Sequence, residues 1–136
     1  MPFEELAHTA DWAVRVWADD LPALLAESVR AVNALSGLEQ VTGPRLSRQL
    51  KLQAEDAESL LVTLLSEIVY LMEQEGLGVE NLHILKLDAP APFWLEAELK
   101  CSPIRSVRKI IKAVTYHNLQ VRRTKRGLEA ELVFDV

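Results

Sequence analysis

The chain of 136 residues lacks several sequence features that mark particular classes of protein. Its only cysteine is Cys101, which cannot form an internal disulfide, so we expect a reducing, cytoplasmic location. No apolar run reaches the ~20 residues that span a bilayer, and "MPFEELAH" lacks the pattern of a secretion signal. With 49% hydrophobic residues, residues 1–136 are expected to form one domain with its own core and no membrane contact.

Sequence signatures of catalysis are also missing. The chain has no glycine-rich phosphate loop, no Cys/His spacing typical of zinc sites and no serine-hydrolase elbow. His83 and His117 have no nucleophile or carboxylate at a diagnostic spacing. The sequence therefore gives no positive case for an enzyme, and we assign no catalytic residue.

The charges are distributed unevenly along the chain. Residues 1–99 carry 6 Lys and Arg against 17 Asp and Glu, whereas residues 100–136 carry 9 against 3. This asymmetry is consistent either with a surface that meets an anionic partner or with an ordinary solvated surface.

Two segments show helical periodicity. An apolar stripe over residues 21–35 follows Asp20 as a plausible N-cap and ends at Gly37, and a wider stripe runs from Asp56 to Gly76. Residues 12–18, 45–55, 79–88 and 92–101 read as strands, and the last of these alternates cleanly. Alternation over 93–101 favours Cys101 as a core thiol over a nucleophile. This order predicts an α+β fold with two main helices on a mixed or antiparallel sheet.

The last third adds a further helix and a hairpin to this prediction. Ser102 and Pro103 are typical of a helix start, so we expect "SPIRSVRKIIKAV" to be helical. A helix would place four cations on one face, as a docking ridge for a partner or as a solvated surface: Arg105, Arg108, Lys109 and Lys112. "TYHNLQVRR", the "TKRG" turn and "LEAELVFDV" read as a hairpin.

Carboxylates near the two ends of the chain suggest a metal site. Alternation places Asp11 and Asp135 on the polar faces of the first and last strands, and Val136 adds an α-carboxylate. If those strands are neighbours, three anionic groups converge and require a cation between them. Oxygen ligands favour a hard ion such as Ca²⁺ or Mg²⁺. His8 and Thr9 are interpreted as turn or capping residues, with a ligand or base role for His8 as the alternative.

Four segments in order resemble the archease family. They are "HTADW" at 8–12, "SLLVTLLSEIVYLMEQEG" at 59–76, "IKAVTYHNLQV" at 111–121 and the terminal "FDV". The resemblance covers nearly the whole chain. It implies a compact α+β module related to strand–helix–strand–strand domains.

The resemblance also implies a function. Archeases serve RtcB-type tRNA-splicing RNA ligases by promoting the covalent guanylate intermediate and repeated turnover, so the expected partner is such a ligase, with tRNA reached indirectly. The ligase itself uses GTP and a divalent metal, usually manganese. The implied archease metal ligands are Asp11, Asp135 and Val136, for Ca²⁺, Mg²⁺ or Mn²⁺, and Lys112 is the implied partner-facing residue.

Several residues depart from the family pattern. Thr63 and Leu64 stand where many members have Asp-Trp, and Trp12 replaces a small aliphatic residue. Asn118 and Gln120 replace two carboxylates that we expect beside the metal site. These changes are expected to weaken metal affinity or to alter the contact with the ligase.

Two other functions remain open from the residues alone. The first is an RNA-binding module that uses the cationic face and the turn at Arg122–Arg126. The second is a small metal-dependent hydrolase centred on His8, Asp11 and Asp135, for which the sequence shows no evident general base.

Overall fold

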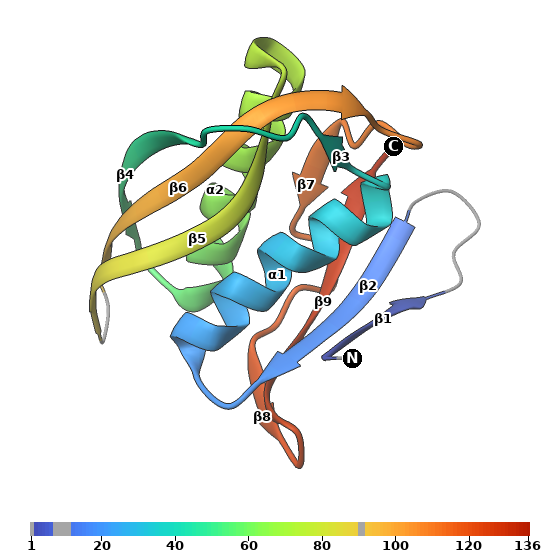
Figure 1. Cartoon of the computed structure of the whole chain (residues 1–136). Helices are drawn as coiled ribbons and strands as arrows, with labels where there is room; N and C mark the ends of the chain where they lie inside the picture. The colour runs from blue at the N-terminus through green and yellow to red at the C-terminus, as the bar shows by residue number, and fades with distance from the viewer. Residues whose placement is uncertain (1, 7–11, 90–91) are drawn as a thin grey trace.

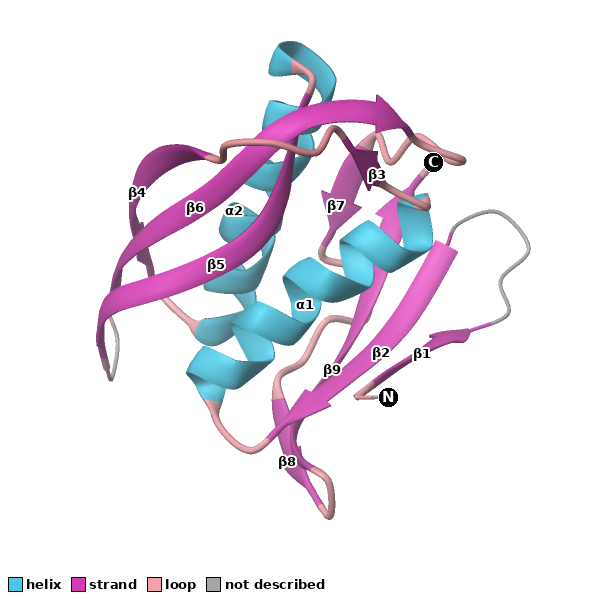
Figure 2. Cartoon of the chain, in the orientation of Figure 1, coloured by secondary structure: helices cyan, strands magenta, loops and turns pink. Residues whose placement is uncertain are grey.

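The structure is a computed structural model that describes residues 2–6, 12–89 and 92–136. It contains two α-helices, a π-helical turn and nine strands in those ranges (Figures 1 and 2). The strands are β1 (Phe3–Leu6), β2 (Trp12–Ala18), β3 (Glu39–Gln40), β4 (Leu46–Ala54), β5 (Leu77–Asp88), β6 (Phe93–Ser106), β7 (Ala113–Thr115), β8 (Arg122–Thr124) and β9 (Gly127–Asp135). The helices are α1 (Leu21–Ser36) and α2 (Ala57–Tyr70), and the π-helical turn η1 (Leu71–Glu75) follows α2.

Helix α1 begins and ends where the sequence predicts. The Asp20 carboxylate accepts the backbone N–H of Ala23 at 2.9 Å, which satisfies one free donor of the first turn. Gly37 ends the helix with φ of 65°, a left-handed conformation that glycine adopts without a Cβ penalty. The predicted boundaries of α1 are therefore confirmed.

The second predicted helix is also present, but its last turn changes type. Asp56 caps α2 by accepting the Ser59 backbone N–H at 2.7 Å, and Gly76 ends the segment with φ of 63°. Between Leu71 and Glu75 the chain forms η1, a wider turn that often lies near functional surfaces. The prediction of residues 56–76 as one helical segment is correct apart from this turn.

The strands form two sheets, and every observed strand pair is antiparallel. The first sheet has the order β1-β2-β9-β7, with β8 also paired to β9. The second has β6 at its centre, paired with β3 and β4 and with β5. The expected α+β fold is confirmed. The condition that the carboxylate site depends on, that the first and last predicted strands are neighbours, is met by the pairing of β2 with β9.

The core lies where the two helices meet the two sheets. Helix α1 contacts β2 and β5, and α2 contacts β4 and β7, so the helices occupy the space between the sheets (Figure 1). Cys101 on β6 is fully buried, as the alternation of that strand predicts, and burial raises the pKa of its thiol. A raised pKa keeps the sulfur protonated and unreactive near neutral pH.

The predicted helix over "SPIRSVRKIIKAV" is wrong. Strand β6 continues through Ser102 and Pro103, which pair with Gly78 and Leu77 of β5. The Pro103 carbonyl also accepts the Val41 N–H at 2.9 Å, and the Ile104 N–H donates to the Gly76 carbonyl at 2.9 Å. Because partner strands on both sides satisfy this backbone, long-range pairing outweighs the local helix-start signal.

After β6 the chain crosses the C-terminal end of α1. The backbone N–H groups of Arg108 and Lys109 both donate to the Ser36 carbonyl, at 2.8 and 3.1 Å. Residues 107–112 are therefore an irregular segment held by helix α1. Arg105 lies at the end of β6 and the other three cations lie in this segment, so the four do not share a helical face.

The alternation of β4 is only partly realised. Leu50 and Leu52 pack against the core and Ala54 is buried, but Leu46, expected on the same inward side, is 50% exposed. Leu46 pairs with Cys101 at the start of β4, where alternation alone overestimates the burial of its side chain.

Candidate functional site

The end of β9 is enclosed by two other strands. Trp12 pairs with Phe134 at the start of β2, and Ala113 of β7 pairs with Asp135 on the other side. The backbone N–H of Lys112 donates to the Asp135 carbonyl at 2.8 Å. Asp135 therefore lies between the start of β2 and the start of β7, at the end of the molecule where the C-terminus is seen in Figure 1.

Of the three predicted metal ligands, the structure describes Asp135 and Val136. The Asp135 side chain is exposed, and Val136 packs partly against the core. Asp11 and His8 lie outside the described residues. Within residues 2–6, 12–89 and 92–136, no three Asp, Glu, His or Cys side chains come close enough to hold a metal ion.

Two of the predicted partner-binding residues lie beside Asp135. The ammonium group of Lys109 sits over the Trp12 ring, 3.8 Å from its centre, a cation–π geometry. Lys112 is exposed and reaches Asp135 through its backbone. Trp12, which departs from the expected pattern, is thus the contact that holds Lys109 against the start of β2.

The four cations predicted to bind a partner differ in their ion pairing from most other Lys and Arg residues of the protein. Arg15, Arg45, Arg48 and Arg126 each form an ion pair with a glutamate. In contrast, no carboxylate of the described residues lies within 4.0 Å of the charged groups of Arg105, Arg108, Lys109 and Lys112.

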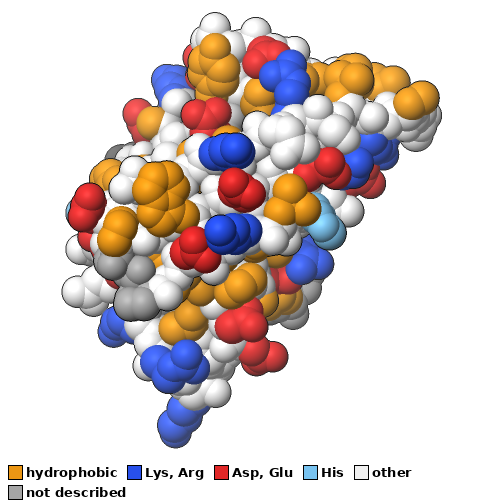
Figure 3. Space-filling view, turned by 90° about the vertical axis from the view of Figure 1, so that its left-hand side faces the viewer, with side chains coloured by type: hydrophobic (Ala, Val, Ile, Leu, Met, Phe, Trp, Pro, Cys, Tyr) orange, Lys and Arg blue, Asp and Glu red, His pale blue; other side chains and the backbone are white. Residues whose placement is uncertain are grey.

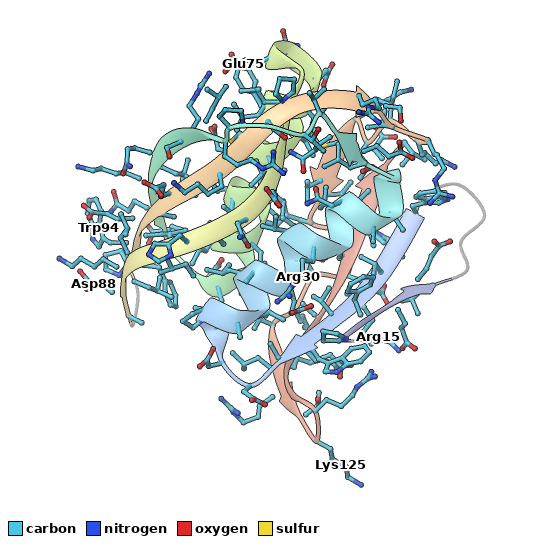
Figure 4. The ribbon with its side chains drawn as sticks, viewed as in Figure 1. Arg15, Arg30, Glu75, Asp88, Trp94 and Lys125 are labelled. Atoms are coloured by element: carbon cyan, nitrogen blue, oxygen red, sulfur yellow. The ribbon has the colours of Figure 1, made fainter. Side chains whose placement is uncertain are left out.

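A polar cavity on the first sheet was not predicted. On one side of β9, residues 133–135 pair with β7 and residues 127–129 pair with β8. Residues 130–132 of β9, between them, have no strand partner on that side in the described chain. The connecting residues 116–121 turn away, with Asn118 at φ of 53°, and leave a cavity of about 480 Å³. Arg15, on β2 (Figure 4), lies at this cavity together with Glu129 and Glu131.

Charged groups of the cavity largely neutralise one another. Arg15 lies 3.6 Å from Glu129 and 3.5 Å from Glu131. Burial raises the pKa of the Glu129 carboxyl, but hydrogen bonds from Arg126 and Thr124 at 3.1 Å and the nearby guanidinium charges outweigh it. The net effect is a pKa below its usual range, so Glu129 stays ionised.

The residues that depart from the family pattern lie in different parts of the structure. Asn118 and Gln120 line the polar cavity, which is lined on β9 by residues 129–131 rather than by Asp135. Leu64 is fully buried in the core, and Thr63 beside it is half-buried. The predicted strand over 115–123 is wrong in its middle: six of its residues, 116–121, lie in neither β7 nor β8, and the cavity lies at this break.

The outer face of the second sheet carries mixed charges. Figure 3 shows acidic and basic side chains interspersed on the side where β4, β5 and β6 lie. Trp94 is 51% exposed and lies with Asp88 at one end of the β5–β6 hairpin, away from β7 and the C-terminus (Figure 4). His83 and His117 are both exposed.

Comparisons with known proteins identify the family. The model of the Archease protein family matches residues 3–136. The chain belongs to the archease family. It is 32% identical to the protein archease of Methanopyrus kandleri over the whole of both chains. It is 30% identical to that of Methanosarcina mazei, with 98% of this chain and 95% of the relative covered.

Solved structures show the same fold. An archease of Thermotoga maritima, named a possible chaperone, matches with a TM-score of 0.68 and 22% identity over 98% of this chain and 96% of the other. A Methanobacterium thermoautotrophicum protein matches with a TM-score of 0.74 and 20% identity over 99% of both chains. None of the helices in the part of this archease that the structure describes is long and apolar enough to cross a membrane.

Proposed function

We propose that this archease is a metal-binding accessory protein that activates an RtcB-type RNA ligase by promoting its guanylylation and multiple turnover. Membership of the archease family supports an accessory role. The observation that carries the proposal is the position of Asp135, exposed between β2 and β7 and beside cations that have no carboxylate of the described residues within 4.0 Å. The ligase would be a cytoplasmic partner, with tRNA contacted only through it.

The proposed metal ligands are Asp11, Asp135 and Val136. The pairing of Trp12 with Phe134 supports this set, since Asp11 precedes Trp12 in the sequence and Asp135 follows Phe134. The donors are oxygen atoms, which suit Ca²⁺, Mg²⁺ or Mn²⁺ better than zinc. When bound, the ion would supply positive charge at this edge of the sheet.

The proposed ligase-facing residues are Lys112, Lys109, Arg108 and Arg105. Lys112 is held by its backbone at Asp135, and Lys109 is held over Trp12. An anionic surface of the ligase, or its bound nucleotide, would provide the carboxylates or phosphates that these side chains lack within the described chain.

The test is a ligation assay with limiting ligase. Adding this archease should convert a single round of ligation into many, and Asp135→Asn and Lys112→Glu should each reduce that gain by about tenfold or more. Asp88→Asn, an exposed change at the distant β5–β6 hairpin, is the matched control and should activate normally. Full activation by a folded Asp135→Asn variant would reject the site.

Direct RNA binding is the second candidate. It is favoured by Arg122, Arg123 and Lys125 at the β8–β9 hairpin, whose tip carries Lys125 outward (Figure 4). RNA bound mainly through phosphates would dissociate steeply as salt rises, without any need for ligase. RNA affinity that is unmeasurable at low salt would reject this candidate.

A further inference from the structure

An apolar groove lies next to the ligase-facing cations. Its walls are the turn η1 with Gly76 on one side and the segment from Ile104 to Ile111 on the other, and its volume is about 390 Å³. The apolar residues that line it are Met72, Ile104, Val107, Ile110 and Ile111. The two walls come from parts of the chain about thirty residues apart, brought together by the pairing of Leu77 with Pro103.

The groove exposes a side chain that a folded protein normally covers. Ile110 is 65% exposed, the highest value among the exposed large hydrophobic residues of the described chain, whereas the next residue, Ile111, is 4% exposed. Ile111 anchors the segment in the core, and this turns Ile110 outward at the mouth of the groove. A docked apolar group would remove this side chain from water, and burial of apolar surface favours binding.

Positive charge borders this groove. Lys109 lines it, and Arg105 and Arg108 are exposed on the same short segment, none of them within 4.0 Å of a carboxylate of the described residues. Glu73, on η1, is the carboxylate among the lining residues. An occupant that fits must therefore combine apolar side chains with negative charge.

We propose that this groove binds an acidic, amphipathic segment of a partner protein, with an aliphatic or aromatic side chain inserted beside Ile110 and carboxylates directed at Lys109 and Arg105. Grooves of this kind hold the apolar face of a short helix through anchors spaced three or four residues apart. The identification of that partner as the ligase rests on the proposed function. The groove itself and the chemistry of the segment that it binds are argued independently of that function.

A nucleic acid fits these observations less well. Phosphates would satisfy the cations, but single-stranded bases are held by stacking on aromatic rings. The groove is lined by aliphatic side chains and has no aromatic residue among its lining. RNA would leave Ile110 uncovered, whereas an acidic amphipathic segment satisfies both the apolar and the charged features.

The first experiment uses designed peptides and the isotope-labelled full-length protein. Three peptides of equal length are titrated: a helix with leucine on one face and glutamate on the other, the same helix with lysine for glutamate, and one with serine for leucine. We expect the Leu/Glu peptide alone to shift the amide resonances of Met72, Val107 and Ile110. Absence of those shifts at about 1 mM peptide, equal binding of the Ser/Glu peptide, or tighter binding of single-stranded RNA at the same residues would overturn the proposal.

Matched variants then connect the groove to the ligase. Ile110→Glu should weaken binding of the Leu/Glu peptide by about tenfold or more, whereas Leu85→Glu, an equivalent change at a 54% exposed leucine of β5, should leave it unchanged. The same pair is compared for binding to purified ligase. If ligase binds the protein but ignores Ile110→Glu, the groove is not its docking site; if ligase fails to bind while the peptide result holds, the proposed function fails and the groove stands.

Discussion

The Asp56 carboxylate at the start of α2 has an electrostatic role in this archease. The Asp56 side chain accepts the Ser59 N–H at 2.7 Å, and that hydrogen bond lowers the pKa of the carboxyl. A lowered pKa means that the folded state prefers the ionised form. The stabilisation is therefore complete above the pKa of the unfolded chain, about 4, and is lost as pH falls through the lower folded-state pKa.

The first prediction concerns this cap. Asp56→Ala should reduce the free energy of unfolding by about 1 kcal/mol at pH 7, because α2 loses the acceptor for a free N–H. The difference between variant and parent should shrink once the pH falls below about 4. Urea denaturation at pH 7 and pH 3 measures both effects, and Asp56→Asn, which keeps an acceptor, is the control. A constant difference at both pH values would contradict the electrostatic explanation.

Gly127 is the residue whose replacement should most disturb the first sheet. It has φ of 107°, and a Cβ atom built there would lie 2.2 Å from the Ala18 carbonyl oxygen. We predict that Gly127→Ala costs about 1–3 kcal/mol of stability, because both the backbone and the β2–β9 contact must shift. Gly43→Ala is the matched control: that position also has a positive φ, 135°, but has no atom near an added Cβ. Equal losses of stability in the two variants would show that the close approach of residue 127 to Ala18 does not contribute to the cost.

At the scale of elements, local signals predicted the helices and the alternating strands, and they failed where strand pairing decides. Asp20, Asp56, Gly37 and Gly76 fix the ends of the two helical segments through contacts within a few residues. The start signal at Ser102 is equally local, yet β5 and β3 pair with that segment instead. Those partners are distant in sequence, so no local pattern reveals them.

Some features of the candidate site could likewise be predicted from the sequence, and others could not. Alternation predicts that Asp135 faces away from the core, and its side chain is exposed, because parity is a local property of a strand. The cavity beside Arg15 and the groove beside Ile110 depend on where residues 116–121 and η1 fall relative to distant strands. Their positions follow only from the assembled fold.

The third prediction tests how the segment 107–112 is joined to β2. Lys109→Gln should lower the free energy of unfolding by about 0.5–1 kcal/mol, because the neutral amide cannot make the cation–π contact with Trp12. Lys112→Gln, which removes an exposed charge without such a contact, should change stability by less than about 0.5 kcal/mol. Chemical denaturation followed by circular dichroism measures both. If the two variants behave alike, the Trp12 contact contributes nothing.

Across the whole molecule, folding removes part of the charge asymmetry of the sequence. Basic residues of both regions pair with acidic ones: Arg126 with Glu4, and Arg15 with Glu129 and Glu131. The Lys and Arg residues left without an ion pair in the described chain all follow residue 104: Arg105, Arg108, Lys109, Lys112, Arg122, Arg123 and Lys125. The available positive charge is thus concentrated on two segments, one beside Asp135 and one at the β8–β9 hairpin.

The last prediction separates an activator from an enzyme. Chemistry on RNA needs groups that hold and move protons at the reacting atoms. His83, His117 and the Asp135 carboxylate are exposed, and the sequence places no nucleophile at a diagnostic spacing from either histidine. We therefore predict that the purified protein with GTP, manganese and RNA neither ligates nor cleaves RNA, nor hydrolyses the nucleotide. Catalytic amounts added to a cognate ligase should instead raise the rate of its guanylylation, measured by labelled GTP. Metal-dependent cleavage by this archease alone, abolished by Asp135→Asn but not by Asp88→Asn, would make it an enzyme, because only a change at the proposed site would then remove the activity.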